Sequence, residues 1–289
     1  MDKKIIDKLF KLHIKNLTDT NFQLFINFLF KLIYGNDFKT IKQKKDKGID
    51  GIIESKKLAI AIYGPELNET RKFIRKIKPD FDKYFKFWKN SLPNWLVIYN
   101  NEILAGQYDF VKTLYKKSEL WGINEIISEI SNLTNSKKLK IGEYLGIDRE
   151  YMSRNIMKEI IDDLIVKQQK ITKPEYKIAL DIDKKIEINF GLHDVESVKK
   201  DFDICLEDFT SLNDILSGYE NDDITKLKSN IISDFNFRHG SFKEKFYGIV
   251  DYYSRDYNND DEYKYYIRVI LYYLFEQCLI GKLTEVETN

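Results

Sequence analysis

The chain has 289 residues, of which 43% are hydrophobic and 14% aromatic, which is enough for one large domain or two ordinary ones with buried cores. Its two cysteines exclude a disulfide framework and a cysteine-rich metal cluster, and we expect a cytoplasmic protein. The net charge of +1 conceals a basic part, residues 1–180 with 34 Lys and Arg against 23 Asp and Glu, and an acidic part, residues 181–289 with 13 against 23. This asymmetry indicates either a nucleic-acid partner for the first part and a protein partner for the second, or two merely solvated surfaces.

No membrane segment is expected. The N-terminus scatters charges among its apolar residues, unlike a secretory signal. The most apolar stretch, residues 265–281, is interrupted by Arg268 and Glu276 and is short for a bilayer, so it predicts a buried helix.

The first hundred residues predict two helices and four strands. Apolar residues recur at helical spacing in the two helical segments, and the segment LAIAIY is a continuous apolar run typical of a strand covered on both faces. A polar hairpin at residues 54–57 joins the second and third strands. The expected order is a helix within 19–38, strands 38–43, 49–54 and 58–63, a helix within 68–90, and a strand 94–100. This order is that of the restriction-endonuclease-like fold, a mixed sheet flanked by helices.

The rest of the chain predicts mostly helices. Residues 138–165 have the pattern of a helix-turn-helix with Gly146 at the turn, and residues 184–192 have a strand-like pattern. We therefore expect an α+β protein with two domains. Residues 1–117 form the endonuclease-like domain, and residues 118–289 form a mainly helical domain for partner binding or oligomerisation.

Asp50 is the residue that most suggests chemistry. Metal-dependent cleavage of a phosphodiester needs oxygen ligands for a hard ion such as Mg²⁺, and the endonuclease-like fold takes one from an aspartate near the start of a strand. Gly48 and Gly51 bracket Asp50 and permit close backbone approach there. The alternative is a turn or bulge aspartate that bonds to its own backbone.

The next strand does not complete the expected motif. Where the fold usually carries Glu/Gln-x-Lys, the sequence has Ala61 and Tyr63. We expect Glu66, just past the strand end, to be the second metal ligand, and Lys57, or its neighbour Lys56, to be the catalytic cation.

A literal Glu-x-Lys triplet occurs in the hairpin, as Glu54-Ser55-Lys56. A regular strand places Glu54 about 13 Å from Asp50, too far to share a metal unless a bulge shortens the path.

Basic residues cluster around this segment and predict contact with DNA phosphates, although a solvated helix face explains them equally well. The predicted helix-turn-helix would direct a second set of residues towards a DNA groove, namely Arg149, Ser153, Arg154 and Lys158. The alternative for this segment is a helical hairpin within a bundle. The expected DNA-binding residues are Lys42, Lys44, Lys45, Lys47, Arg71, Lys72, Arg75 and Lys76.

The runs GNDFKTIKQKKDKGIDGIIESKKLAIAIYGPE, KIKPDFDKYFKFW and NWLVIYNN resemble the restriction-endonuclease-like subunit of ABC-three-component antiphage systems, of which the Lamassu type is the best known. KKIEINFGL and YLFEQCLIG are similar to elements near the end of such subunits. The resemblance implies an SMC/ABC-type ATPase and a further small subunit as partners, and action as a homo-oligomer. Ala61 departs from the family pattern, which usually has a polar ligand there.

Three functions follow as hypotheses. The first is a Mg²⁺-dependent DNA nuclease subunit of a bacterial antiphage complex, centred on Asp50 and Glu66. The second is a catalytically inactive subunit of the same fold that binds DNA or scaffolds the ATPase, and Ala61 favours it. The third is a helix-turn-helix DNA-binding regulator.

Overall fold

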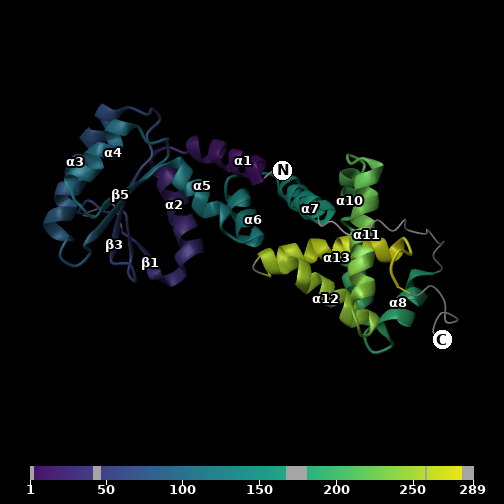
Figure 1. The fold of residues 1–289 in the computed structure, drawn as a ribbon. Coiled ribbons are helices and arrows are strands. Elements are labelled where there is room, and N and C mark those ends of the chain that lie inside the picture. Colours follow the sequence, from purple (N-terminus) through teal and green to yellow (C-terminus); the bar gives the residue numbers. More distant parts are fainter. Residues whose placement is uncertain (1–2, 42–46, 167–180, 258, 282–289) are drawn as a thin grey trace. The chain divides into compact units, whose positions relative to one another are not determined.

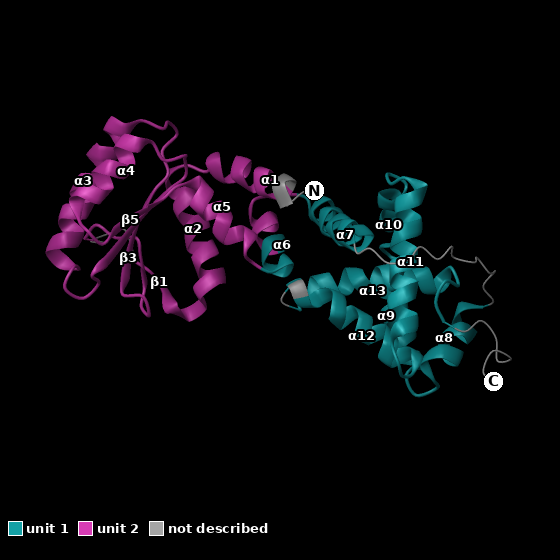
Figure 2. Cartoon of the chain, viewed as in Figure 1, with its two compact units in different colours: residues 1–2, 134–139, 148–289 teal, residues 3–133, 140–147 magenta. Residues whose placement is uncertain are grey.

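The computed structural model describes residues 3–41, 47–166, 181–257 and 259–281 (Figure 1). The chain divides into two compact units (Figure 2). The sheet unit comprises residues 3–133 and 140–147, and the helical unit comprises residues 134–139 and those from 148 onward. The architecture is α+β, as expected. The fifth strand continues the sheet beyond residue 117, where the sequence placed the end of the first domain.

A five-stranded mixed sheet forms the centre of the sheet unit, with the order β1-β2-β3-β4-β5. β1 pairs with β2 and β2 with β3 in antiparallel fashion, whereas β3–β4 and β4–β5 are parallel. β3 and β4 are almost continuously apolar because helices cover both of their faces. The strands are β1 Phe38–Thr40, β2 Gly51–Ile53, β3 Leu58–Tyr63, β4 Asn94–Tyr99 and β5 Ser118–Trp121.

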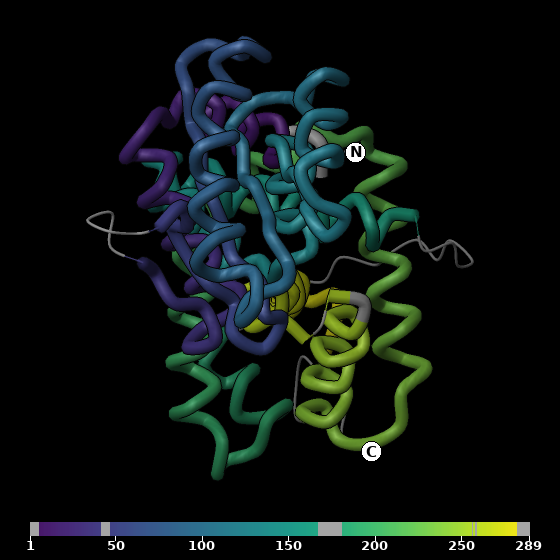
Figure 3. Tube along the Cα trace, turned by 90° about the vertical axis from the view of Figure 1, so that its left-hand side faces the viewer, coloured from purple at the N-terminus to yellow at the C-terminus, as the bar shows by residue number. Residues whose placement is uncertain are grey.

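Helices lie on both faces of the sheet. α3 (Thr70–Phe87) and α4 (Ala105–Leu114) cover one face, and α2 (Asp19–Tyr34) and α5 (Ile123–Ser131) lie on the other, with α1 (Lys3–Lys15) next to α5 (Figure 1). Figure 3, which views the molecule from the side of α3 and α4, shows these two helices in front of the strands. The predicted order of helix, three strands, helix and strand is thus present.

Apolar residues at helical spacing attach α3 to the sheet. Phe73, Ile77, Phe81 and Tyr84 are buried against the odd-numbered residues of β3 and β4. Burial of each large side chain contributes about 1.5–3 kcal/mol to folding. Tyr84 also donates a hydrogen bond from its hydroxyl to the carbonyl oxygen of Leu92 at 2.8 Å. The opposite face of α3 is left to its charged residues.

The helical unit packs around α13, which buries most of its length. This confirms the buried helix predicted from the apolar stretch 265–281. Among the described residues, no helix combines the length and apolar character needed to cross a bilayer. The helices from α6 onward are α6 Asn135–Tyr144, α7 Arg149–Val166, α8 Ile182–Phe190, α9 Val195–Leu206, α10 Phe209–Leu216, α11 Asn221–Phe237, α12 Phe242–Ser254 and α13 Asp261–Glu276.

The strand expected over residues 184–192 is wrong, because this segment is helix α8. Asp181 caps the helix by accepting a hydrogen bond from the main-chain N–H of Asp183 at 3.1 Å. The buried residues Lys185, Ile186, Asn189 and Phe190 lie on one helical face. The short apolar alternation of IEINF resembled a strand because a few residues do not distinguish the two periods.

Residues 138–165 form two helices, α6 and α7, as the sequence predicts. Gly146 lies between them with φ of +71°, a conformation that favours glycine. Both helices begin and end close to where the sequence predicts.

Candidate functional site: Asp50 and the basic face of helix α3

Asp50 lies directly before β2, where the pairing of β2 with β3 ends. Its main-chain N–H donates to the carbonyl oxygen of Ile60 at 2.7 Å, and its side-chain Oδ2 accepts from the main-chain N–H of Ile62 at 2.7 Å. The other carboxylate oxygen, Oδ1, accepts from Nε2 of Gln23 in α2 at 2.9 Å. The carboxylate therefore takes the place of a main-chain acceptor beside β3 and links that strand to α2.

The two glycines beside Asp50 allow close packing, as the sequence predicts. Gly48 has φ of +86°, and a Cβ there would overlap the carbonyl oxygen of Asp80 in α3. A Cβ on Gly51 would lie 2.7 Å from the ring of Phe38. The turn that presents Asp50 is thus fixed by contacts with both neighbouring elements.

β3 supplies neither a carboxylate nor an amine beside Asp50. Ala61, only 2% exposed, faces the core beneath α3, as does half-buried Tyr63. Tyr63 stacks on Tyr99 with ring centroids 5.9 Å apart, and burial raises the pKa of the Tyr63 phenol. Because side chains alternate along a strand, Ile60 and Ile62 face the opposite layer. Neither face of β3 therefore provides the Glu/Gln-x-Lys pair.

Glu66 and Lys57 lie at opposite ends of β3. Lys57 is in the hairpin just before the strand, with φ of +46°, and Glu66 is an exposed residue after its last position. Six strand residues span about 20 Å, so Lys57 and Glu66 are not brought together. Asp50, bonded to Ile60 and Ile62, lies beside the second half of β3. Within the described ranges, no group of three or more His, Cys, Asp or Glu residues is arranged to hold a metal.

Gln23 is the site residue that the sequence interpretation missed. It is a polar residue within the apolar segment NFQLFINFLF, next to the buried Phe22. This polar interruption of a buried helix was the available signal. Asp50 and Gln23 offer side-chain oxygens beside β3. Asp19, whose main-chain N–H donates to the carbonyl oxygen of Gly64 at 2.7 Å, lies at the end of this strand, and Glu66 follows it in the chain.

The outer face of α3 is basic. The helix has seven Lys and Arg residues and two Asp residues, and the four predicted DNA-binding positions on it are exposed. Lys72 pairs with Glu69 at 2.8 Å, and Lys76 pairs with Asp80 at 2.9 Å. Arg71 and Arg75 make no ion pair with any residue that the structure describes. Their positive charges lie near the N-terminal end of α3, whose main-chain dipole also attracts anions.

The loop before Asp50 carries the remaining predicted DNA-binding residues. Lys42, Lys44 and Lys45 lie outside the described residues. Lys47 is described, and its Nζ lies 5.0 Å from the ring centroid of Phe87 at the end of α3.

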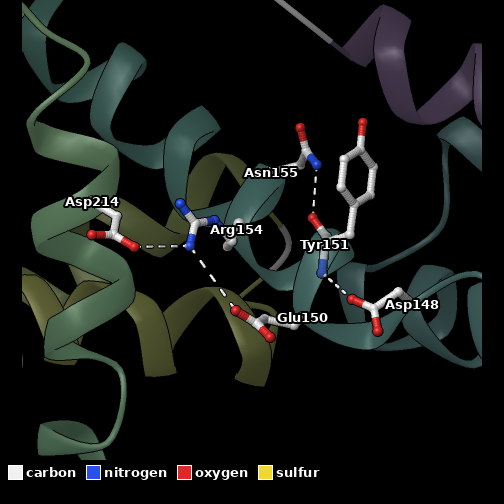
Figure 4. A network of polar contacts seen from close by, with 6 residues as sticks. All are labelled: Asp148, Glu150, Tyr151, Arg154, Asn155 and Asp214. Carbon is white, nitrogen blue, oxygen red and sulfur yellow. Dashed lines mark hydrogen bonds and ion pairs between the residues drawn. The ribbon is translucent and has the colours of Figure 1, made fainter.

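The basic residues of α7 are engaged within the helical unit. Figure 4 shows Arg154 between Asp214 of α10, at 3.3 Å, and Glu150, at 4.0 Å. Arg149 pairs with Glu262 at 3.9 Å. These pairs are largely exposed and contribute little stability, but they neutralise the cations that a DNA groove would need.

A pocket beside α7 is acidic. Burial raises the pKa of Glu262, while Arg149 opposes the shift. Ser153, which the helix-turn-helix interpretation directs towards DNA, lines this pocket. Lys158 lines a neighbouring pocket together with Asp162 and Asp223. The carboxylates around the first pocket are Glu150, Glu207, Asp208, Asp261 and Glu262.

In comparisons with known proteins, no protein-family profile, no curated protein and no solved structure matches this chain.

Proposed function

We propose that the chain is a DNA-binding, catalytically inactive subunit of restriction-endonuclease-like fold, acting in a bacterial antiphage complex beside an SMC/ABC-type ATPase. The observation that carries the proposal is β3, which places Ala61 and Tyr63 on one face and Ile60 and Ile62 on the other. A strand of this composition offers neither a metal ligand nor a cation. The order of the elements and the mixed sheet support the fold assignment.

The basic face of α3 supports DNA as the partner. Lys and Arg that neutralise phosphates supply most sequence-independent affinity, and each contact releases counterions. Arg71 and Arg75 carry charges that no described carboxylate neutralises, so they are the residues to which we assign phosphate contact. The acidic pocket beside α7 repels phosphates and disfavours that helix as the DNA-binding element.

Metal-dependent cleavage is the second candidate function, and one observation favours it. Asp50 lies beside the second half of β3, Glu66 follows this strand in the chain, and Gln23 lies beside Asp50. Carboxylate and amide oxygens are ligands that Mg²⁺ accepts. When bound, the ion would polarise a phosphate and an attacking water, and Asp50 and Glu66 are the residues that would hold it.

Binding of a fluorescent duplex at several salt concentrations tests the DNA-contact proposal. Arg71→Gln/Arg75→Gln removes two phosphate contacts, so the slope of log K against log salt should become shallower by about two and the affinity should fall about tenfold near physiological salt. Arg149→Gln/Arg154→Gln makes the same chemical change in the helical unit and should alter affinity less than about twofold. Equal losses in the two variants, or a loss only in the second, would contradict the assignment to α3.

Plasmid nicking with Mg²⁺ or Mn²⁺ separates the two candidate functions. The full chain is assayed alone and with the products of its neighbouring genes, beside Asp50→Asn. Absence of nicking under all conditions, with duplex binding and co-purification of the ATPase intact, supports the inactive subunit. Nicking that disappears in Asp50→Asn would establish the nuclease instead.

A further inference from the structure

The C-terminal end of α3 exposes aromatic rings beside lysines. Phe85 is 42% exposed and Phe87 48% exposed, although both rings are fully apolar. The Phe85–Phe87 surface is defined here by Lys47, Phe85, Lys86, Phe87, Lys89 and Tyr115. Exposed lysines 116 and 117 follow Tyr115 directly in the chain.

The rings and the cations are in contact. Nζ of Lys89 lies 3.9 Å from the ring centroid of Phe85 and 5.5 Å from that of Tyr115. Nζ of Lys47 and of Lys86 lie 5.0 Å and 5.2 Å from the ring centroid of Phe87. These are cation–π distances, and they hold positive charge directly over exposed aromatic surface.

No carboxylate neutralises this surface within the part of the chain that the structure describes. Lys47, Lys86 and Lys89 make no ion pair with a described residue, whereas Lys76 and Lys78, nearer the start of α3, pair with Asp80 and Asp82. The Phe85–Phe87 surface therefore combines unneutralised cations with partly exposed aromatic rings.

The two phenylalanines face different sides of the last turn of α3. Residues two apart on a helix are rotated by about 200°. Phe85 packs edge-on against Tyr115 with centroids 6.0 Å apart, on the side of α4, whereas Phe87 lies beside Lys47 in the loop before β2. The surface therefore has two separate aromatic rings, Phe85 and Phe87, each with at least one lysine beside it.

We propose that the Phe85–Phe87 surface binds single-stranded nucleic acid. The lysines that lie over the rings turn to the phosphates, and bases stack on the ring faces that the lysines leave. Rings that stack bases and a basic track for the backbone are the two parts of sequence-independent single-strand sites. A duplex hides its base faces and would use only the lysines. The inference rests on the proposed DNA contact and extends it to unpaired DNA, such as frayed ends or displaced strands.

Fluorescence anisotropy with a labelled 15-nucleotide oligo-dT and a labelled 15-base-pair duplex tests the proposal on the full chain. Phe85→Leu/Phe87→Leu keeps apolar bulk but removes both stacking faces. It should weaken oligo-dT binding at least about tenfold and duplex binding less than about twofold. The matched control is Phe237→Leu, which removes a ring that is 86% exposed in the helical unit and should change neither affinity.

Each alternative outcome has a definite meaning. Unchanged oligo-dT binding in Phe85→Leu/Phe87→Leu would overturn the inference, and the proposed function would stand if Arg71→Gln/Arg75→Gln still weakens duplex binding. An equal loss for duplex and single strand would also overturn it, because stacking would not be the cause. Loss of ATPase co-purification with oligo-dT binding intact would make the surface a protein interface and overturn it too. If the wild-type chain binds neither DNA, the proposed function itself fails.

Discussion

Replacement of Asp50 by alanine should destabilise the sheet unit, independently of any catalytic role. The substitution removes acceptors at 2.7 Å for the main-chain N–H of Ile62 and at 2.9 Å for Nε2 of Gln23. Hydrogen bonds to a charged partner contribute about 1.5–3 kcal/mol each, and this pair is only part-buried, so we expect the free energy of unfolding to fall by about 2–4 kcal/mol. Asp50→Asn keeps an oxygen for Ile62 and should cost about 1 kcal/mol.

Urea unfolding followed by tryptophan fluorescence measures the free energy of unfolding of the sheet unit. All three tryptophans, Trp88, Trp95 and Trp121, belong to the sheet unit, so the signal reports its unfolding and not that of the helical unit. A double-mutant cycle with Gln23→Ala should give a coupling of about 0.5–3 kcal/mol with Asp50→Ala. An alanine variant that unfolds at the wild-type urea concentration would refute the reasoning. If Asp50→Ala is as stable as the wild type and yet loses nicking, that loss would be evidence that Asp50 takes part in catalysis.

Three further changes have expected outcomes. Gly48→Ala should lower the stability of the sheet unit by about 2–4 kcal/mol, because φ is +86° and the new Cβ overlaps a main-chain oxygen of α3. Gly106→Ala, at an exposed position of α4, is the control and should be neutral or slightly stabilising in the same fluorescence assay. Tyr144→Ala removes a ring stacked on Phe28 with centroids 4.5 Å apart and should cost that unit about 1–2 kcal/mol by urea unfolding. Burial raises the pKa of Glu262 above 4.5, so its protonated form contributes stability that is fully present below pH 4.5 and is lost as pH rises through the raised pKa. Glu262→Gln should therefore raise the melting temperature, followed by circular dichroism, more at pH 7.5 than at pH 4.5.

Continuous apolar runs made the centre of the fold predictable. The sequence places β3 at 58–63, as observed, and β4 within one residue, because strands covered on both faces contain few polar residues that blur their ends. The strands β1 and β2 are only three residues each, shorter than predicted, since part of each expected strand lies in the turn or beyond the described residues. The wrong strand over 184–192 came from a segment too short to separate a period of 2 from one of 3.6.

The site was predictable only in its local parts. The glycines on either side of Asp50 predicted close packing of the backbone there, and the carboxylate predicted a polar interaction. Its partner Gln23 is 27 residues away, and no local pattern specifies which helix residue meets the end of a strand. The rings of Phe85 and Phe87 were expected in the helix of residues 68–90, but their exposure follows from tertiary packing. The separation of Lys57 from Glu66, in contrast, follows from the strand at 58–63 that the sequence already predicted between them.

The hydrogen bond from Asp50 to the main chain of β3 gives this aspartate a role in folding that is separate from any chemistry. A side chain that replaces a main-chain acceptor stabilises the fold whether or not it also takes part in catalysis. The aspartate is therefore a poor marker of activity in chains that fold in this way. The side chain of Ala61 makes no such hydrogen bond, and the buried position under α3 requires only a small, apolar residue. Position 61, on the neighbouring strand, is therefore a better place than Asp50 to look for evidence of catalysis.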